Sequence, residues 1–219
     1  MTTIRGFYIN LEERPDRKKH FLSEMEKIRL PMPNLEVERF NAIKHSNGAL
    51  GCSMSHLRCI QDAKRENWEK VLIMEDDTTF LNTELFVSQL DIFLKSTREW
   101  DVLLLAGNNL LPYKAINNNC IQVFNCLTTT AYIVKSHYYD TLINNYKEGI
   151  LNLMKEPERK KEYAIDKYWQ RLQRKDKWYL LIPPSIVQYE NYSDIEKKQT
   201  NFQDYMLNYN KAVIGGRLT

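Results

Sequence analysis

The chain has 219 residues, of which 43% are hydrophobic, 11% aromatic and 27% charged. These proportions exclude a disordered or fibrous protein and allow one substantial core. The 31 basic and 28 acidic residues give a net charge of +3. They are spread along the chain, without the basic patch that nucleic-acid binding requires. No apolar stretch approaches the roughly 20 residues of a membrane span, and the first residues lack the apolar run of a signal peptide. The four cysteines show no C-x-x-C spacing and are expected to be buried, reduced thiols. We therefore expect a cytoplasmic protein. The sequence is also compatible with peripheral contact to a membrane.

The first half of the chain alternates apolar runs with residues at helical spacing. Apolar or alternating runs predict strands over residues 4–11, 35–40, 71–74 and 101–106. Helical spacing predicts helices after Pro15, after Gly51 and through residues 85–93. Residues 41–51 contain two glycines and are expected to form a loop. This order is typical of an α/β fold.

The second half continues the same fold class after a polar loop that follows residue 110. Strands are predicted over 121–124, 128–134 and 178–182, and helices over 138–146 and 165–172. The last thirty residues are polar and rich in tyrosine. No repeat or linker is present, so we expect a single domain over residues 1–219, with residues 190–219 as a C-terminal segment that wraps the domain or covers a site.

Three adjacent carboxylates, Glu75, Asp76 and Asp77, follow the buried strand at 71–74. Their mutual repulsion is relieved when a divalent cation binds among them, and ligation by oxygen alone favours Mg²⁺ or Mn²⁺ over Zn²⁺. A solvated turn explains the same residues equally well, because Asp-Asp-Thr is also a reasonable helix-capping sequence.

Two further clusters contain residues suited to ligand binding. Asn10, Arg14 and Arg17 stand where the first strand meets the first helix, a position that favours phosphate oxygens, although salt bridges to neighbouring acidic residues account for them as well. Residues 48–56 form a glycine-containing segment that lets the backbone approach a ligand. Within that segment we expect His56 to be a structural group and Cys52 to pack inward with Cys59.

The order and the residue identities of these clusters resemble those of glycosyltransferase family 25, which includes lipooligosaccharide and collagen galactosyltransferases. The resemblance spans roughly residues 4–195. It is carried by Tyr8-Ile9-Asn10-Leu11 with Arg14 and Asp16-Arg17, Gly48-Ala49-Leu50-Gly51-Cys52 with Ser55-His56-Leu57, Met74-Glu75-Asp76-Asp77, Thr130-Ala131-Tyr132, Asp166 before a Trp, and Pro184 leading to Gln188 and Ser193-Asp194-Ile195.

The resemblance implies a GT-A-like fold, which is a Rossmann-like α/β/α nucleotide-sugar-binding domain with a mixed central sheet. It further implies a metal-dependent, inverting transfer of a hexose of galactose or glucose type from a UDP-sugar to a hydroxyl of a glycan, glycolipid or glycoprotein, as in lipopolysaccharide biosynthesis. The expected cofactor is Mn²⁺ or Mg²⁺. A nucleotide-sugar-binding module without transferase activity and a metal-dependent phosphohydrolase are the alternatives.

The resemblance also implies roles for individual residues. Asp77 and Asp166 are the expected catalytic residues, with Asp166 as the base, although a carboxylate at a helix start is also favoured by the helix dipole. The expected metal ligands are Asp77, Glu75 and Asp194. The expected donor-binding residues are Asn10, Arg14, Arg17, Ala42, Gly51, Ser55, Glu75, Asp76, Gln188 and Asp194. Met74 stands where the family often has Leu, and because several members are longer, the acceptor is left open.

Overall fold

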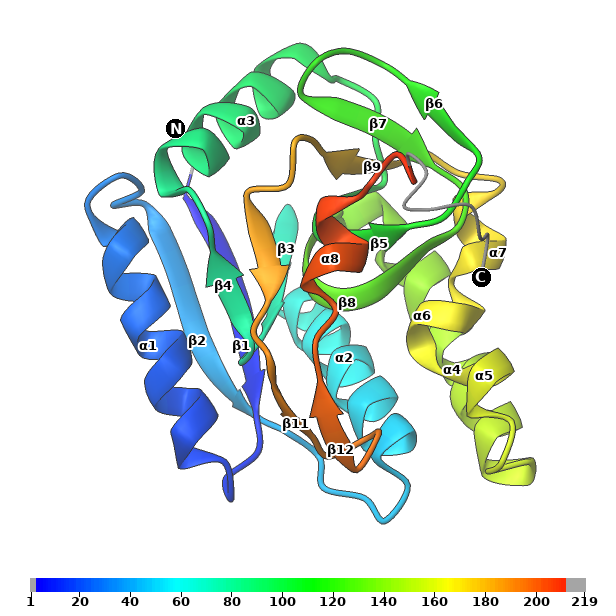
Figure 1. The fold of residues 1–219 in the computed structure, drawn as a ribbon. Coiled ribbons are helices and arrows are strands. Elements are labelled where there is room, and N and C mark those ends of the chain that lie inside the picture. The colour runs from blue at the N-terminus through cyan, green and yellow to red at the C-terminus, as the bar shows by residue number, and fades with distance from the viewer. Residues whose placement is uncertain (1–2, 212–219) are drawn as a thin grey trace.

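The computed structural model describes residues 3–211, and its centre is an eight-stranded sheet. The strands of this sheet are β1 (Ile4–Asn10), β2 (Leu35–Asn41), β3 (Lys70–Glu75), β5 (Val102–Asn109), β6 (Tyr113–Ala115), β7 (Cys120–Val123), β8 (Cys126–Lys135) and β9 (Trp178–Leu181). Their order is β2-β1-β3-β8-β5-β9-β7-β6 (Figure 1). Strand β1 is parallel to β2 and β3, whereas β8 is antiparallel to β3 and β5. The sheet is therefore mixed, as expected.

Two small sheets lie beside the central one. Strand β4 (Thr78–Phe80) pairs antiparallel with β10 (Ile186–Gln188), and β11 (Asn191–Ser193) pairs antiparallel with β12 (Lys198–Thr200). The sequence pattern predicts none of these strands, nor β6. Each has only three residues, which is too short for the alternation of apolar and polar residues that identifies a strand.

Helices cover both faces of the central sheet. They are α1 (Pro15–Arg29), α2 (Gly48–Arg65), α3 (Thr83–Ser96), α4 (Tyr139–Lys155), α5 (Lys160–Tyr163), α6 (Ile165–Tyr168), α7 (Gln170–Gln173) and α8 (Gln203–Leu207), with a short 3-10 helix, η1 (Ser136–Tyr138). Successive strand residues point to opposite faces. Phe7 and Ile73 accordingly pack with α2 and α4, while Tyr8 and Leu72 pack with α1 and α3. The predicted α/β/α class is confirmed.

Several predicted boundaries differ from the structure; the helix predicted over 138–146, for example, continues to Lys155 as α4. The expected loop over 41–51 ends early, because α2 begins at Gly48 with the Asn47 side chain accepting hydrogen bonds from the first backbone N–H groups. Gly51 lies in the first turn of α2, where a Cβ would overlap the Ile43 carbonyl oxygen. The single helix predicted over 165–172 is instead two short helices, α6 and α7, joined at Trp169.

The described part of the predicted C-terminal segment forms β11, β12 and α8, and residues 212–219 lie outside the described residues. The extent of the domain, residues 1–219, stays a prediction. Across residues 3–211, no helix combines the length and apolarity that a membrane crossing demands.

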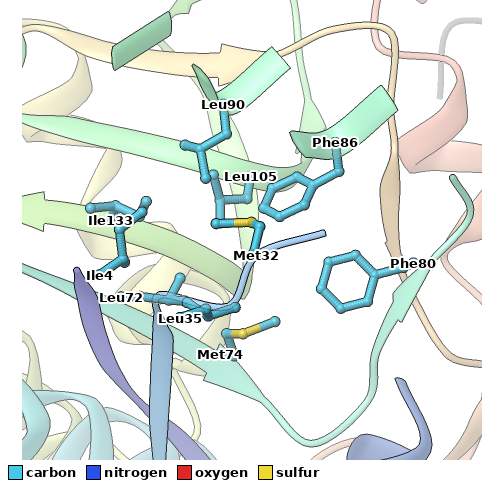
Figure 2. Close-up of a pocket in the computed structure, with 10 residues that line it drawn as sticks. All are labelled: Ile4, Met32, Leu35, Leu72, Met74, Phe80, Phe86, Leu90, Leu105 and Ile133. Atoms are coloured by element: carbon cyan, nitrogen blue, oxygen red, sulfur yellow. The ribbon is translucent and has the colours of Figure 1, made fainter. Parts of the chain in front are cut away.

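A small cavity of about 10 Å³ lies in the core on the α3 side of the sheet (Figure 2). Apolar side chains line it, among them Leu72, Met74, Phe86 and Leu90. This volume is about that of one water-sized probe, and an apolar lining offers water no partners. The cavity is therefore a packing feature of the core and too small for a substrate.

Gly6 tests how tightly β1 and β3 pack. A Cβ at Gly6 would overlap the carbonyl oxygen of Leu72, its register partner on β3. We expect Gly6→Ala to lower the free energy of unfolding by about 3 kcal/mol, as overpacking against backbone does, when measured by urea denaturation. Arg5→Ala, which changes the exposed neighbour on the same strand, is the control and is expected to stay within about 0.5 kcal/mol of wild type. Equal stability of Gly6→Ala and wild type would contradict the packing described.

Candidate active site

A cleft of about 240 Å³ opens at the carboxyl ends of β1 and β3. These strands are parallel and in register from Gly6 with Leu72 to Ile9 with Glu75, so both end at the same edge of the sheet. Ligand crevices of open α/β sheets lie at such edges. Nine of the predicted site residues line the cleft: Arg17, Ala42, Gly51, Ser55, Glu75, Asp76, Asp77, Gln188 and Asp194. Asn10, Arg14 and Asp166 are outside its lining.

Asp77 is the most buried carboxylate of the cleft, with 1% of its side chain exposed. Its Oδ2 accepts hydrogen bonds from the Arg17 guanidinium and from Gln188 Nε2, the latter at 2.8 Å. Its Oδ1 is buried and has no hydrogen-bond partner within residues 3–211. Burial raises the pKa of Asp77 to about 7, although Arg17 opposes this shift. A buried carboxylate oxygen without a partner can accept a cation from the cleft.

Asp76 is held by Asn10 and Arg17. Asn10 Nδ2 donates to Asp76 Oδ2 at 2.7 Å, and Arg17 Nε lies 3.1 Å from Asp76 Oδ1. Arg39 Nε in turn donates to Asn10 Oδ1 at 3.0 Å. Burial raises the pKa of Asp76, and Arg17 lowers it. Asn10 thus acts behind the cleft wall by fixing Asp76.

Glu75 faces a different set of partners. Its Oε1 accepts hydrogen bonds from Thr129 Oγ1 and from His56 Nε2, the latter at 3.1 Å. Because a carboxylate only accepts, we assign the ring proton to Nε2, and Nδ1 then accepts from Tyr132 Oη at 2.8 Å. Burial raises the pKa of Glu75, but the hydrogen bonds from His56 and Thr129 and the nearby charges of His56 and Arg17 together lower it below its ordinary value.

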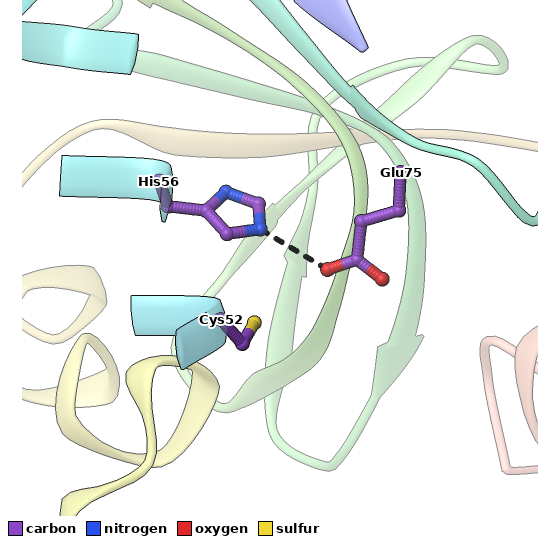
Figure 3. Close-up of side chains that lie close together, drawn as sticks. All are labelled: Cys52, His56 and Glu75. Atoms are coloured by element: carbon purple, nitrogen blue, oxygen red, sulfur yellow. Dashed lines mark hydrogen bonds and ion pairs between the residues drawn. The ribbon is translucent and has the colours of Figure 1, made fainter. Parts of the chain in front are cut away.

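Cys52 completes a group with His56 and Glu75. One ligand atom from each residue lies within 4.8 Å of the others, and the three side chains converge in Figure 3. Burial raises the pKa of the Cys52 thiol well above its ordinary value. As expected, His56 is buried and hydrogen-bonded and Cys52 packs against the core that contains Cys59, and both residues also line the cleft. Their spacing of four residues on one helix, which places side chains on one face, is the signal that was available.

The turn between β11 and β12 forms one wall of the cleft. Ser193, Asp194 and Ile195 line it. Arg14, which precedes α1, donates to Asp194 Oδ2 at 2.5 Å, and Lys160 on α5 lies 3.0 Å from Glu196. Ion pairs from both sides of the cleft therefore hold this turn.

Asp166 lies at the start of α6, where its Oδ2 accepts a hydrogen bond from the Thr128 backbone N–H at 3.1 Å. Thr128 has a φ of 70°, a conformation that β-branched residues rarely adopt. Burial raises the pKa of Asp166, and the nearby charge of Glu75 adds to the rise. The carboxylate stabilises the unusual backbone, and its catalytic role stays a prediction.

The burial of Asp77 makes stability depend on pH. The pKa of Asp77 is about 7 in the folded protein against an ordinary value of 3.8, so the folded state keeps a proton that the unfolded state loses. Its contribution to stability therefore falls as pH rises between these values. We expect the unfolding free energy of Asp77→Asn, relative to wild type in EDTA, to rise with pH by up to about 1.4 kcal/mol per unit in that window. A constant offset in denaturation measurements from pH 5 to pH 8 would contradict this.

Solved structures with distant likeness to this chain include two glycosyltransferases. One is a Drosophila β-1,4-galactosyltransferase 7 in complex with manganese, UDP-Gal and xylobiose, with a TM-score of 0.48 and 10% identity, covering 91% of this chain and 76% of that one. The other is the glycosyltransferase GlyE of Streptococcus pneumoniae, with a TM-score of 0.49 and 10% identity, covering 97% of this chain and 61% of that one. At these scores the likenesses add nothing to the assignment of function.

Two sequence comparisons are more informative. The chain is 24% identical over 183 residues to a procollagen lysyl hydroxylase and glycosyltransferase of Acanthamoeba polyphaga mimivirus, an alignment that covers 67% of this chain. The chain spans about a fifth of the length of that relative. The model of glycosyltransferase family 25, described as an LPS biosynthesis protein, matches residues 44–212, which include Cys52, His56 and the acidic triplet. The match covers more than half of the chain, which therefore belongs to glycosyltransferase family 25.

Proposed function

We propose that this chain transfers a hexose of galactose or glucose type from a UDP-sugar to a hydroxyl of a glycan, glycolipid or glycoprotein, with inversion at the anomeric carbon. The observation that carries the proposal is Asp77, a buried carboxylate at the cleft of a family 25 chain, one oxygen of which has no hydrogen-bond partner among residues 3–211. The family description names LPS biosynthesis, which supports a lipid-linked glycan as the acceptor. A cytoplasmic location stays a prediction.

The carboxylates of the cleft suit a divalent ion. Asp77, Glu75 and Asp194 all line the cleft and offer oxygen ligands, the type that Mn²⁺ and Mg²⁺ prefer. Asp77 Oδ1, which has no hydrogen-bond partner in the described part of the chain, fits such an ion, because burial without a partner is otherwise unfavourable for a carboxylate oxygen. When bound, the ion would neutralise charge that develops on the departing diphosphate.

Arg17 is the basic residue best placed for the donor phosphates. Its side chain is 16% exposed, lines the cleft and already pairs with Asp76 and Asp77. A guanidinium offers five N–H donors, so it can keep a carboxylate and still bind a phosphate oxygen. Arg14 is held by Asp16 and Asp194 outside the cleft lining, so we propose that it acts through Asp194.

The segment before α2 shapes the opposite wall. Ser55 Oγ accepts from the Ile43 N–H at 2.8 Å and donates to the Gly51 carbonyl at 2.7 Å. These two bonds fix the backbone beside Ala42 and Gly51, and the lack of a Cβ at Gly51 lets the Ile43 backbone pack closely against α2. We propose that the nucleoside of the donor binds against this wall.

The donor and metal proposal is tested by thermal denaturation with UDP and Mn²⁺. A ligand at 100 times its dissociation constant adds about 2.7 kcal/mol of stability. We expect UDP to raise the melting temperature of wild type only with Mn²⁺, and Asp77→Asn to lose this effect. Asp91→Asn on α3, whose carboxylate pairs with Lys95 away from the cleft, is the matched control and is expected to keep it.

An equal UDP shift without Mn²⁺, or a full shift in Asp77→Asn, would contradict the metal proposal. UDP binding without sugar release from any UDP-hexose would instead favour a binding module. Phosphate release from simple esters would favour a phosphohydrolase.

We propose Asp166 as the general base that removes the acceptor proton. Burial raises its pKa above the ordinary value, which is the direction that strengthens a carboxylate as a base. We expect Asp166→Asn to lower kcat for sugar transfer by roughly 100-fold or more, the usual contribution of a positioned base, while UDP binding with Mn²⁺ stays unchanged. Thr128→Gly, which adopts the same backbone conformation without strain, separates loss of the base from loss of backbone support. Wild-type kcat in Asp166→Asn would exclude this residue as the base.

A further inference from the structure

We propose that Cys52, His56 and Glu75 form a binding site for a thiophilic divalent ion of the Zn²⁺ class, with one coordination position open to the cleft. This site is separate from the carboxylate ligands proposed for Mn²⁺, apart from the shared Glu75. It does not rest on the proposed transferase activity, because it follows from the three side chains alone.

The backbone brings one sulfur, one nitrogen and one oxygen ligand together. Cys52 and His56 are four residues apart on α2 and project from the same helix face, and Glu75 ends β3 opposite them (Figure 3). Their ligand atoms lie within 4.8 Å of one another. Three protein ligands of these types with one open position are typical of tetrahedral Zn²⁺ sites that admit a further ligand.

Buried charge around the group favours a cation. Glu75, Asp77 and Asp166 all act electrostatically on the Cys52 thiol. Arg17 is the nearby guanidinium, and it is committed to Asp76 and Asp77 rather than to Cys52. Carboxylates are thus the main charged groups that act on the thiol, and a divalent ion bound among them would be stabilised.

The residues behind the ligands are already arranged to support them. Tyr132 Oη lies 2.8 Å from His56 Nδ1 and 3.2 Å from Tyr146 Oη. With a metal on Nε2, the ring proton would lie on Nδ1, which would donate a hydrogen bond to Tyr132 Oη, and the Tyr132 hydroxyl would in turn donate to Tyr146 Oη. Metal-bound histidines commonly have such a partner on the second nitrogen. The Cys52 thiol loses its proton on binding, so one proton is released per ion.

Ligand chemistry separates this site from the proposed Mn²⁺ site. Sulfur and imidazole ligands select Zn²⁺ and Co²⁺, and Mn²⁺ stands lowest in affinity for a given mixed site. Mn²⁺ and Mg²⁺ would remain with the carboxylate oxygens of Asp77 and Asp194. The two sites meet only at Glu75.

The experiment uses Co²⁺ as the probe, titrated into the whole metal-free protein with a phosphine reductant. We expect a near-ultraviolet band from thiolate-to-cobalt charge transfer that saturates at about one equivalent and disappears with Zn²⁺ but not with equal Mn²⁺. Cys52→Ser is expected to lose the band and to bind Co²⁺ at least about tenfold more weakly. Cys59→Ser, seven residues along the same helix, is the matched control. It is expected to keep both the charge-transfer band and the wild-type affinity for Co²⁺.

Two results would overturn the proposal: no charge-transfer band in wild type at millimolar Co²⁺, or a band that persists in Cys52→Ser. Glu75→Gln is a second variant that keeps the residue's size, and circular dichroism verifies its fold. Glu75→Gln is expected to keep the thiolate-to-cobalt band but to bind Co²⁺ more weakly than wild type. An unchanged Co²⁺ affinity would exclude Glu75 as a ligand. Asp77→Asn should keep the band while losing UDP binding with Mn²⁺, so failure of either proposal is distinguishable from failure of the other.

Discussion

The pairing of Arg17 with Asp76 and Asp77 is the interaction on which the cleft depends. Removing two neighbouring carboxylates from water is strongly unfavourable unless an opposite charge and hydrogen bonds replace the solvent. Arg17 supplies the charge from α1, and Asn10 and Gln188 supply hydrogen bonds from β1 and β10. The three elements must therefore meet at the end of β3 for the acidic triplet to be buried.

This requirement explains why the cleft is assembled from distant parts of the chain. Its floor is the end of β3, one wall is the start of α2 with residues 42–46, and the other is the turn between β11 and β12. Arg14 and Lys160 hold that turn from opposite sides. The C-terminal half of the chain thereby completes a site whose first residues stand in β1 and α1.

Glu75 divides the cleft into two chemical environments. On the side of Asp77 the available ligands are oxygens, with one buried oxygen lacking a partner among residues 3–211. On the side of His56 they include a thiol and an imidazole, backed by Tyr132 and Tyr146. Strand β3 ends at Glu75 and the chain turns at Asp76 and Asp77, so neighbouring carboxylates can serve different ligands.

The sequence by itself determined the α/β class, the long strands and the place of the acidic triplet, because apolar runs and their abrupt end are local signals. It did not reveal β4, β10, β11 or β12, which are too short to carry a pattern, or the start of α2, where two glycines resembled a loop. Only the tertiary structure decided that Arg17 pairs with Asp77, sixty residues away, and that His56 bonds to Glu75. It also excluded Asp166 from the cleft lining. These outcomes depend on which strand ends and helix faces meet in space, and no local pattern encodes that.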